Sequence, residues 1–149
     1  MHSRLDGAGA RISGGRWNSR GKPMVYMAES IALAVLENLV HMAPGDFPAK
    51  YVVVGAQIPD DLPALTDREL IARTGLNDPR LLGDFWLDSH ETAVLAVSSV
   101  VVPAEHNFLL NPSHPDFSRM LLRYLYRSGL MNDFCATLTK FGVVREACE

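Results

Sequence analysis

The sequence predicts a single compact α+β domain. Short apolar runs over residues 24–28, 50–58 and 92–102 have the composition of buried strands, and helical patterns lie between them. No regular strand–helix–strand repeat orders these segments, which argues against a doubly wound parallel sheet. The length of 149 residues suits one domain with its own core, and no internal repeat or long linker divides the chain.

The first third of the chain contains three local signals. Residues 6–15 include four glycines, which predict turns and close backbone approaches. The segment 24–28 is apolar with a β-branched centre and predicts a buried strand. Ser30 is the predicted N-cap of a helix over 31–42, because its hydroxyl can accept a backbone N–H of the first turn. A Pro-Gly pair ends that helix.

The later elements are predicted by the same signals. The segments 50–58 and 92–102 each indicate a buried strand, and 92–102 has the strongest strand pattern of the chain. Residues 67–74 indicate a short helix, with Gly75 beyond its end. The pattern of residues 76–91 gives no assignment.

The composition is that of an ordinary globular protein, with 48% hydrophobic and 21% charged residues. No apolar run reaches the roughly 18–20 residues that cross a bilayer. The N-terminus lacks the apolar stretch of a secretory signal, so we expect a cytoplasmic protein that does not bind membranes. Cys135 and Cys148 have no metal-ligand spacing and are expected to be free thiols.

Charge is distributed unevenly along the chain. Residues 1–28 have a net charge of +4, and the remainder has a net charge of −7. A basic, glycine-rich entry to an acidic body favours a small anionic ligand and disfavours direct contact with nucleic acid. A solvated terminus explains the same charge equally well.

Several common catalytic motifs are absent from the sequence. Gly7-Ala8-Gly9 lacks the third glycine of a dinucleotide-binding fingerprint. There is no phosphate loop, no Gly-x-Ser-x-Gly elbow and no histidine pair at zinc spacing. We therefore expect no metal and no resident cofactor.

Two ordered blocks of the sequence resemble the RES domain, the toxin half of certain bacterial toxin–antitoxin pairs. The blocks are GGRWNSRGKPMVYMAESIALAVLENLVH over residues 14–41 and SSVVVPAEHNFLLNPSHPDF over residues 98–117. The resemblance runs from Leu5 to Phe117. It implies a compact fold like that of the ADP-ribosyltransferases and cleavage of NAD at the nicotinamide–ribose bond, with NAD as the substrate.

Carried over by position, the family's site residues fall on Arg16, Tyr26, Glu37, Ser99 and Asn107. The resemblance implies catalytic roles for Glu37, Tyr26 and Arg16. It implies substrate binding by Arg16, Tyr26, Ser99 and Asn107. Ser98 is the alternative to Ser99, because this chain has serine where a proline would usually precede the family's serine.

These residue types suit the chemistry that the resemblance implies. A guanidinium binds phosphate oxygens through a planar fork of donors, so Arg16 suits the pyrophosphate of NAD. Tyr26 offers a flat ring for stacking on nicotinamide and a hydroxyl to orient it. Breaking the glycosidic bond builds positive charge on the ribose, and a carboxylate such as Glu37 stabilises that charge as it develops.

Each residue also has a structural interpretation that needs no ligand. Arg16 would make a surface ion pair, and Tyr26 would pack in the core. Glu37 would pair with His41 one helical turn later. Ser99 would be a satisfied core hydroxyl. Glu105 and Asn107 would be turn residues that bond their own backbone.

The resemblance is incomplete at both ends. The family's leading strand is missing before residue 5, and residues 118–149 form a divergent tail that we expect to pack on the RES domain of residues 1–117. The tail pattern predicts a helix over 117–128, with Phe117, Leu121, Tyr124 and Leu125 packed inward and the arginines exposed. Phe134, Leu138 and Phe141 indicate a second helix.

The leading functional hypothesis is therefore an NAD-consuming toxin that an antitoxin neutralises. The family's usual antitoxin has an Xre-type helix-turn-helix domain, so contact with DNA would be indirect. Water, phosphate or a protein are all compatible acceptors of the ADP-ribose. One alternative is an inactive remnant that only binds the antitoxin, which would follow if the tail cannot replace the missing strand. The other is a stand-alone nucleotide-binding module.

Overall fold

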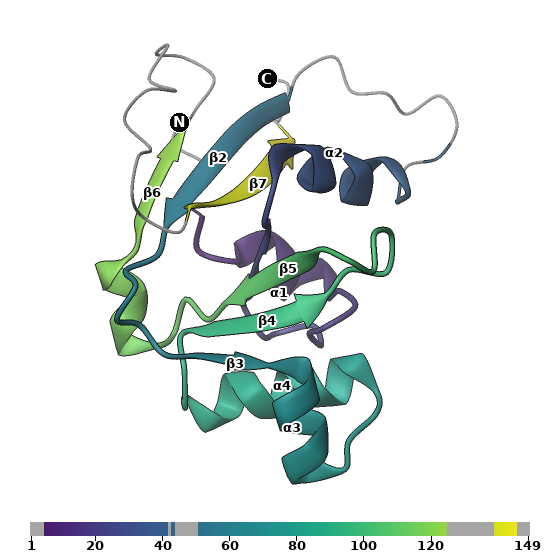
Figure 1. Cartoon of the computed structure of the whole chain (residues 1–149), viewed down its shortest axis with the longest axis vertical. Helices are drawn as coiled ribbons and strands as arrows, with labels where there is room; N and C mark the ends of the chain where they lie inside the picture. The colour runs from purple at the N-terminus through teal and green to yellow at the C-terminus, as the bar shows by residue number, and fades with distance from the viewer. Residues whose placement is uncertain (1–4, 42, 44–50, 125–138, 146–149) are drawn as a thin grey trace.

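A seven-stranded mixed sheet organises the molecule in the computed structural model, which describes residues 5–41, 43, 51–124 and 139–145 (Figure 1). The helices are α1 (Ala8–Ser13), α2 (Ile31–Leu39), α3 (Asp67–Thr74) and α4 (Pro79–Ser89), with a 3₁₀ helix η1 (Pro115–Arg119). The strands are β1 (Val25–Ala28), β2 (Tyr51–Gln57), β3 (Ala64–Thr66), β4 (Val94–Ser98), β5 (His106–Leu110), β6 (Leu121–Tyr124) and β7 (Thr139–Arg145). The predicted single α+β domain is confirmed.

The sheet consists of two halves that meet at one point. Its strand order is β3-β4-β5-β1-β7-β2-β6, and of the described strands β1 and β7 are matched only at Ala28 and Phe141. One hydrophobic cluster joins side chains of β1, β4 and β5 to side chains of β2 and of the segment before β6. Its buried members are Val25, Met27, Ala56, Ile58, Leu62, Ala93, Val94, Leu110 and Met120. The two halves therefore pack against each other through this cluster.

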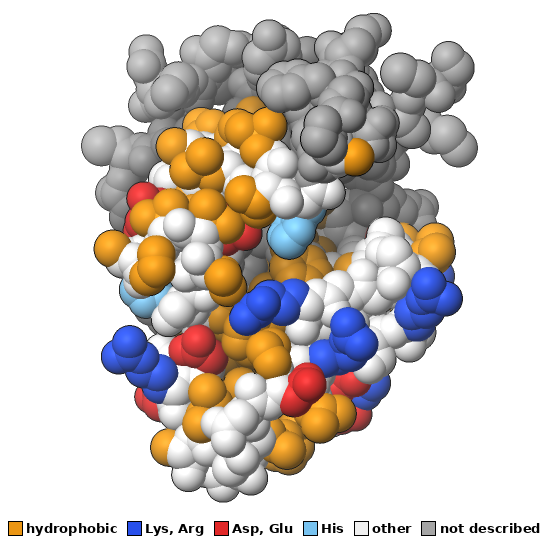
Figure 2. All heavy atoms as spheres, turned by 90° about the vertical axis from the view of Figure 1, so that its right-hand side faces the viewer, with side chains coloured by type: hydrophobic (Ala, Val, Ile, Leu, Met, Phe, Trp, Pro, Cys, Tyr) orange, Lys and Arg blue, Asp and Glu red, His pale blue; other side chains and the backbone are white. Residues whose placement is uncertain are grey.

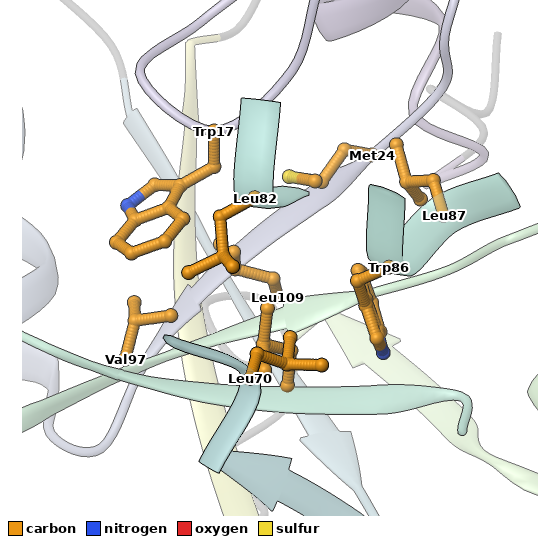
Figure 3. Close-up of a cluster of buried hydrophobic side chains, with 9 residues drawn as sticks. Trp17, Met24, Leu70, Leu82, Trp86, Leu87, Val97 and Leu109 are labelled. Carbon is orange, nitrogen blue, oxygen red and sulfur yellow. The ribbon is translucent and has the colours of Figure 1, made fainter. Parts of the chain in front are cut away.

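The other face of β4, β5 and β1 is covered by helices. Leu95, Val97 and Leu109 point to this face and pack with Trp17 and with side chains of α3 and α4 (Figure 3). Near the far end of β1, α2 packs against the same face, where Leu33 and Ala34 contact Ala28. The segment around Trp17, α3 and α4 therefore cover one part of this face, and α2 covers another.

Local sequence signals determine most of the helix boundaries. The Ser30 hydroxyl accepts the N–H of Leu33, as predicted for an N-cap. α3 has the predicted bounds, and Gly75 follows it with a left-handed φ of 71°. Residues 76–91, whose pattern predicts no element, contain α4, and Asp78 caps its N-terminus just before Pro79.

The predicted helix over 117–128 is wrong where the structure describes the chain. η1 ends at Arg119, and residues 121–124 form β6, which pairs antiparallel with β2. Leu121 is exposed while Leu122 packs against the core, the alternation of a strand. An open edge of β2 supplies a ladder of backbone hydrogen bonds, and this tertiary pairing overrides the helical pattern.

The second predicted helix is also wrong at its end, because residues 139–145 form β7 between β1 and β2. Leu125, Phe134 and Leu138 lie outside the described residues, as do Cys135 and Cys148.

Candidate active site

Glu37 is the centre of a hydrogen-bonded group built from three separate elements. Its Oε1 atom accepts a hydrogen bond of 2.7 Å from the Ser99 hydroxyl and one of 2.6 Å from the Asn107 side-chain amide. The glutamate comes from α2, the serine follows β4, and the asparagine lies in β5. Both donors bind the same oxygen, so neither bond uses Oε2. The carboxylate is thus oriented through one of its two oxygens.

The serine of this group is held by the turn in which it lies. Ser99 is 3% exposed, and its hydroxyl oxygen accepts the N–H groups of Val101 and Val102. Those two bonds leave the hydroxyl hydrogen for Glu37. The side chain of Ser98 points to the opposite face of the sheet from that of Ser99, and the backbone N–H of Ser98 donates to the Asp67 carboxylate. The structure therefore brings Ser99, and not Ser98, to Glu37.

α2 is fastened to the segment that carries Asn107. The Ser30 hydroxyl donates to Glu105 over 3.1 Å, and Glu29 accepts the N–H of His106 over 2.9 Å. These bonds fix the start of α2 beside the start of β5. The carboxylate of Glu105 therefore contacts Ser30, a contact that its interpretation as a turn residue does not include.

Tyr26 lies on the same face of the sheet as Asn107. In the β1–β5 pairing Tyr26 is opposite Leu109 and Ala28 is opposite Asn107, and residues two apart on a strand share a face. Tyr26 and Asn107 are thus diagonal neighbours, a relation in which Cα atoms are roughly 7–8 Å apart. The tyrosine is 39% exposed, which is more than a core residue would be.

The hydroxyl of Tyr26 is used within the protein. It donates to Oδ1 of Asn18 over 2.7 Å and accepts the N–H of Trp17 over 3.1 Å. Burial of the phenol raises the pKa of Tyr26 to about 12, so this hydroxyl is neutral at physiological pH and is no general base. The part of Tyr26 that is left for a ligand is its ring.

Arg16 lies in a turn against Tyr26, between Gly15 and Trp17. A Cβ atom at Gly15 would be 2.5 Å from the Tyr26 hydroxyl, so the turn approaches the tyrosine as closely as glycine allows. Arg16 is exposed, and within the described part of the chain it makes no ion pair. Its backbone is therefore placed beside Tyr26, while no hydrogen bond joins it to the Glu37 group.

Figure 2 shows one face of the molecule, on which lysine and arginine side chains lie near a hollow with apolar side chains inside it, and aspartate or glutamate side chains lie beside them. A separate hollow of about 320 Å³ is lined by Thr66, Asp67, Arg68, Ala96, Ser98, Pro103 and His106. Ser98 and His106 alternate with Ser99 and Asn107 along their strands, so this second hollow does not contain the Glu37 group.

Two residues beside Tyr26 were not singled out by the sequence. Asn18 is fully buried, and Arg80 donates from Nε to the carbonyl oxygen of Gly15 over 3.3 Å. Asn18 lies two residues after Arg16, in the first block that resembles the RES domain, and this position is the signal that could have identified it. Arg80 lies in the region of residues 76–91 that had no assignment, and no signal indicated it.

The described residues were also compared with what a metal site and a membrane span require. In the described residues, no group of three His, Cys, Asp or Glu side chains is placed to hold a metal ion. No helix among these residues combines the length and the apolar character needed to span a membrane.

The molecule is a mixed α/β domain in which two donors orient the Glu37 carboxylate, and the chain belongs to the RES domain family. The RES domain model matches residues 1–127, which extends past Phe117 into β6. The RES domain has an ADP-ribosyltransferase-like fold, so the fold expected from the two sequence blocks is confirmed.

Named relatives are toxins. The chain is 40% identical over 138 residues to the "Prs ADP-ribosylating toxin" of Sphingobium sp. (strain YBL2), with 82% of this chain and 83% of that protein covered. It is 32% identical over 127 residues to the "Toxin Res" of Photorhabdus laumondii subsp. laumondii, with 81% of each chain covered. It is 35% identical over 126 residues to the "Toxin Res" of Yersinia enterocolitica, with 81% of this chain and 83% of that protein covered.

The two neighbouring serines give a matched test of the site. For the NAD cleavage that the family resemblance implies, we expect Ser99→Ala to lower turnover on the order of tenfold, because Glu37 loses one of the two donors that orient it. Ser98→Ala should leave turnover unchanged. Initial rates of nicotinamide release, with thermal unfolding of both variants, measure this. Equal losses in the two variants would contradict the assignment of Ser99.

Proposed function

We propose that this protein is a RES toxin that cleaves NAD at the bond between nicotinamide and ribose. The observation that carries the proposal is the Glu37 carboxylate, whose Oε1 is held by Ser99 and Asn107 while neither bond uses Oε2. A preorganised carboxylate of this kind stabilises a cation that forms beside it.

The reaction divides into bond cleavage and capture. The C–N bond breaks, its electron pair leaves with nicotinamide, and the ribose becomes an oxocarbenium-like cation. Glu37 stabilises this cation more than it stabilises the ground state, which is the condition for catalysis. An acceptor oxygen then adds to the ribose and loses its proton. Water would give hydrolysis, phosphate would give phosphorolysis, and a protein side chain would give ADP-ribosyl transfer.

Tyr26 and Arg16 bind two different parts of NAD. The Tyr26 ring stacks on the nicotinamide, and the Asn18 and Trp17 bonds to its hydroxyl keep the ring in place. Arg16 binds the pyrophosphate with its guanidinium. NAD is the substrate, and no further cofactor enters the proposal.

The named relatives support the biological setting. One of them is named for ADP-ribosylation, which favours transfer of the ADP-ribose to an acceptor as the outcome of the first step. We place this protein in the cytoplasm as the toxin of a toxin–antitoxin pair. Its partner in the proposal is an Xre-type helix-turn-helix antitoxin, and DNA is contacted only through that antitoxin.

The tail argues for an active toxin rather than an inactive remnant. The remnant hypothesis depended on a tail that fails to complete the sheet. β6 and β7 both pair with β2, and β7 also meets β1 in the strand that carries Tyr26. The tail therefore contributes strands to the sheet that supports the site.

Substitution of Arg16 tests the binding part of the proposal. We expect Arg16→Ala to raise the KM for NAD by about 10- to 100-fold with a smaller change in kcat, because a charge-assisted phosphate contact contributes roughly 1.5–3 kcal/mol. Arg20→Ala is the control, since Arg20 is a nearby exposed arginine whose Nε bonds the carbonyl of Ser13. Steady-state kinetics with NAD measure both. A KM that is unchanged in Arg16→Ala would remove this residue from the site.

The overall reaction has its own test. The purified protein, freed of any partner, should release nicotinamide from NAD, and chromatography of the second product distinguishes the three acceptors. A well-folded protein that releases no nicotinamide would contradict the proposed function.

A further inference from the structure

Asn18 is a buried amide whose every polar atom is used. Its side chain is 0% exposed. Nδ2 donates to the carbonyl oxygens of Ala10, Ser19 and Lys22 at 2.9, 3.2 and 2.9 Å, and Oδ1 accepts the Tyr26 hydroxyl at 2.7 Å. One amide thus joins α1, the segment that follows Arg16 and the central strand β1.

The same connection holds the turn around Arg16 from both sides. The N–H of Gly15 donates to the backbone carbonyl of Asn18 over 2.9 Å, and the N–H of Trp17 donates to the Tyr26 hydroxyl over 3.1 Å. A Cβ atom at Gly15 would lie 2.5 Å from the Tyr26 hydroxyl and 2.8 Å from Oδ1 of Asn18. The residues on either side of Arg16 are therefore fixed by Asn18 and Tyr26.

A second buried asparagine shows what a purely structural role looks like. Asn111 is 1% exposed, donates to the carbonyl oxygen of Leu87 and accepts the N–H of Ser113. Asn111 follows the end of β5 opposite to Asn107, and both of these partners are backbone groups. Asn18 differs because one of its partners is the hydroxyl of Tyr26, a residue that is partly exposed on the face that carries Asn107.

We infer that Asn18 is a positioning residue for NAD. Through the Tyr26 hydroxyl it sets the spacing between the Tyr26 ring and the Arg16 turn, and so between the nicotinamide and pyrophosphate subsites. This inference rests on the proposed function. It assigns Asn18 to ground-state binding, because the Glu37 group is built from other elements and makes no bond to Asn18.

Two pairs of variants test the inference in the full chain. We expect Asn18→Ala to raise the KM for NAD on the order of tenfold with kcat within about twofold of wild type, because ring and turn lose their common anchor. Asn111→Ala should lower the melting temperature without changing KM.

Gly15→Ala tests the same spacing without removing a polar group. Its new methyl group must separate the Tyr26 hydroxyl from Asn18, so KM should rise as in Asn18→Ala. Gly9→Ala is the control, since a Cβ atom at Gly9 meets nothing within 4 Å. This pair also decides the question if Asn18→Ala does not fold.

Non-additivity separates positioning from general destabilisation. Asn18→Ala and Tyr26→Phe remove the same hydrogen bond, so the KM of the double variant should be no higher than that of the worse single variant. Effects on KM that multiply, or a wild-type KM in both folded Asn18→Ala and Gly15→Ala, would overturn the inference.

A measurement without NAD keeps this inference separable from the proposed function. Hydrogen exchange of the Trp17 amide should accelerate at least tenfold in Asn18→Ala and remain at the wild-type rate in Asn111→Ala. Unchanged exchange at Trp17 would overturn the role of Asn18 even if NAD is cleaved. Absence of nicotinamide release in wild type, with faster exchange in Asn18→Ala, would instead count against the proposed function.

Discussion

Glu37→Gln should reduce nicotinamide release from NAD by a factor on the order of 100 to 1,000, since one preorganised electrostatic contact typically contributes that much to turnover. Glutamine retains an oxygen that accepts the Ser99 and Asn107 bonds at the position of Oε1. It replaces Oε2 by an amide nitrogen, which cannot stabilise a ribose cation. The substitution therefore changes the charge and preserves the shape.

A control is needed for the fold of this variant. Thermal unfolding of Glu37→Gln should resemble that of wild type, because both hydrogen bonds to the Oε1 position are retained. Activity of Glu37→Gln within about threefold of wild type would remove Glu37 from the mechanism, since the contact would then be worth less than about 1 kcal/mol.

Gly83→Ala should produce a large loss of stability, because the added methyl group meets backbone atoms. A Cβ atom at Gly83 would lie 1.9 Å from the carbonyl oxygen and 2.8 Å from the carbonyl carbon of Trp17. These are backbone atoms, so no side-chain rotation relieves the clash. Alanine in a helix interior normally stabilises by about 1 kcal/mol over glycine. The clash reverses that sign, and we expect a net loss of at least about 2 kcal/mol.

The measurement is the free energy of unfolding in urea, with Gly9→Ala as the control. Gly9 is also a helical glycine, but a Cβ atom there has open space. Gly9→Ala should therefore be neutral or stabilising, whereas Gly83→Ala should lower the melting temperature by roughly 4–8 °C. A Gly83→Ala variant as stable as wild type would show that α4 does not pack against the Arg16 turn as described.

Helix ends could be predicted from the sequence where residues close along the chain determine them. The hydroxyl of Ser30 before α2 and Gly75 after α3 each fix a helix end through a few neighbouring atoms. Such bonds depend on residues close in sequence, so their pattern is readable without the fold. The same holds for the short apolar strand β1.

The tail could not be predicted in this way, because its structure depends on β2. Residues 121–124 have a helical apolar pattern, yet they lie beside a strand that is about 70 positions away in the sequence and that offers backbone partners. Periodicity within a segment contains no information about such an edge. The expected helix was therefore replaced by β6.

The site shows the same division. The polar residues of the two blocks were identified by resemblance, and the structure brings Glu37, Ser99 and Asn107 into direct contact. The connection between Tyr26 and Asn18 was not foreseen, because it depends on how the Arg16 turn folds back on β1. A buried asparagine in a loop has no distinctive pattern in a single sequence.

Single-turnover nicotinamide release is the most direct test of the central claim that an oriented Glu37 cleaves NAD. The enzyme, purified free of any partner, is mixed in excess with NAD, and nicotinamide is quantified over time in wild type and Glu37→Gln at equal folded concentration. We predict that wild type converts the bound NAD and that Glu37→Gln does so on the order of 100 to 1,000 times more slowly. Equal rates in the two proteins, or no release by folded wild type, would contradict it.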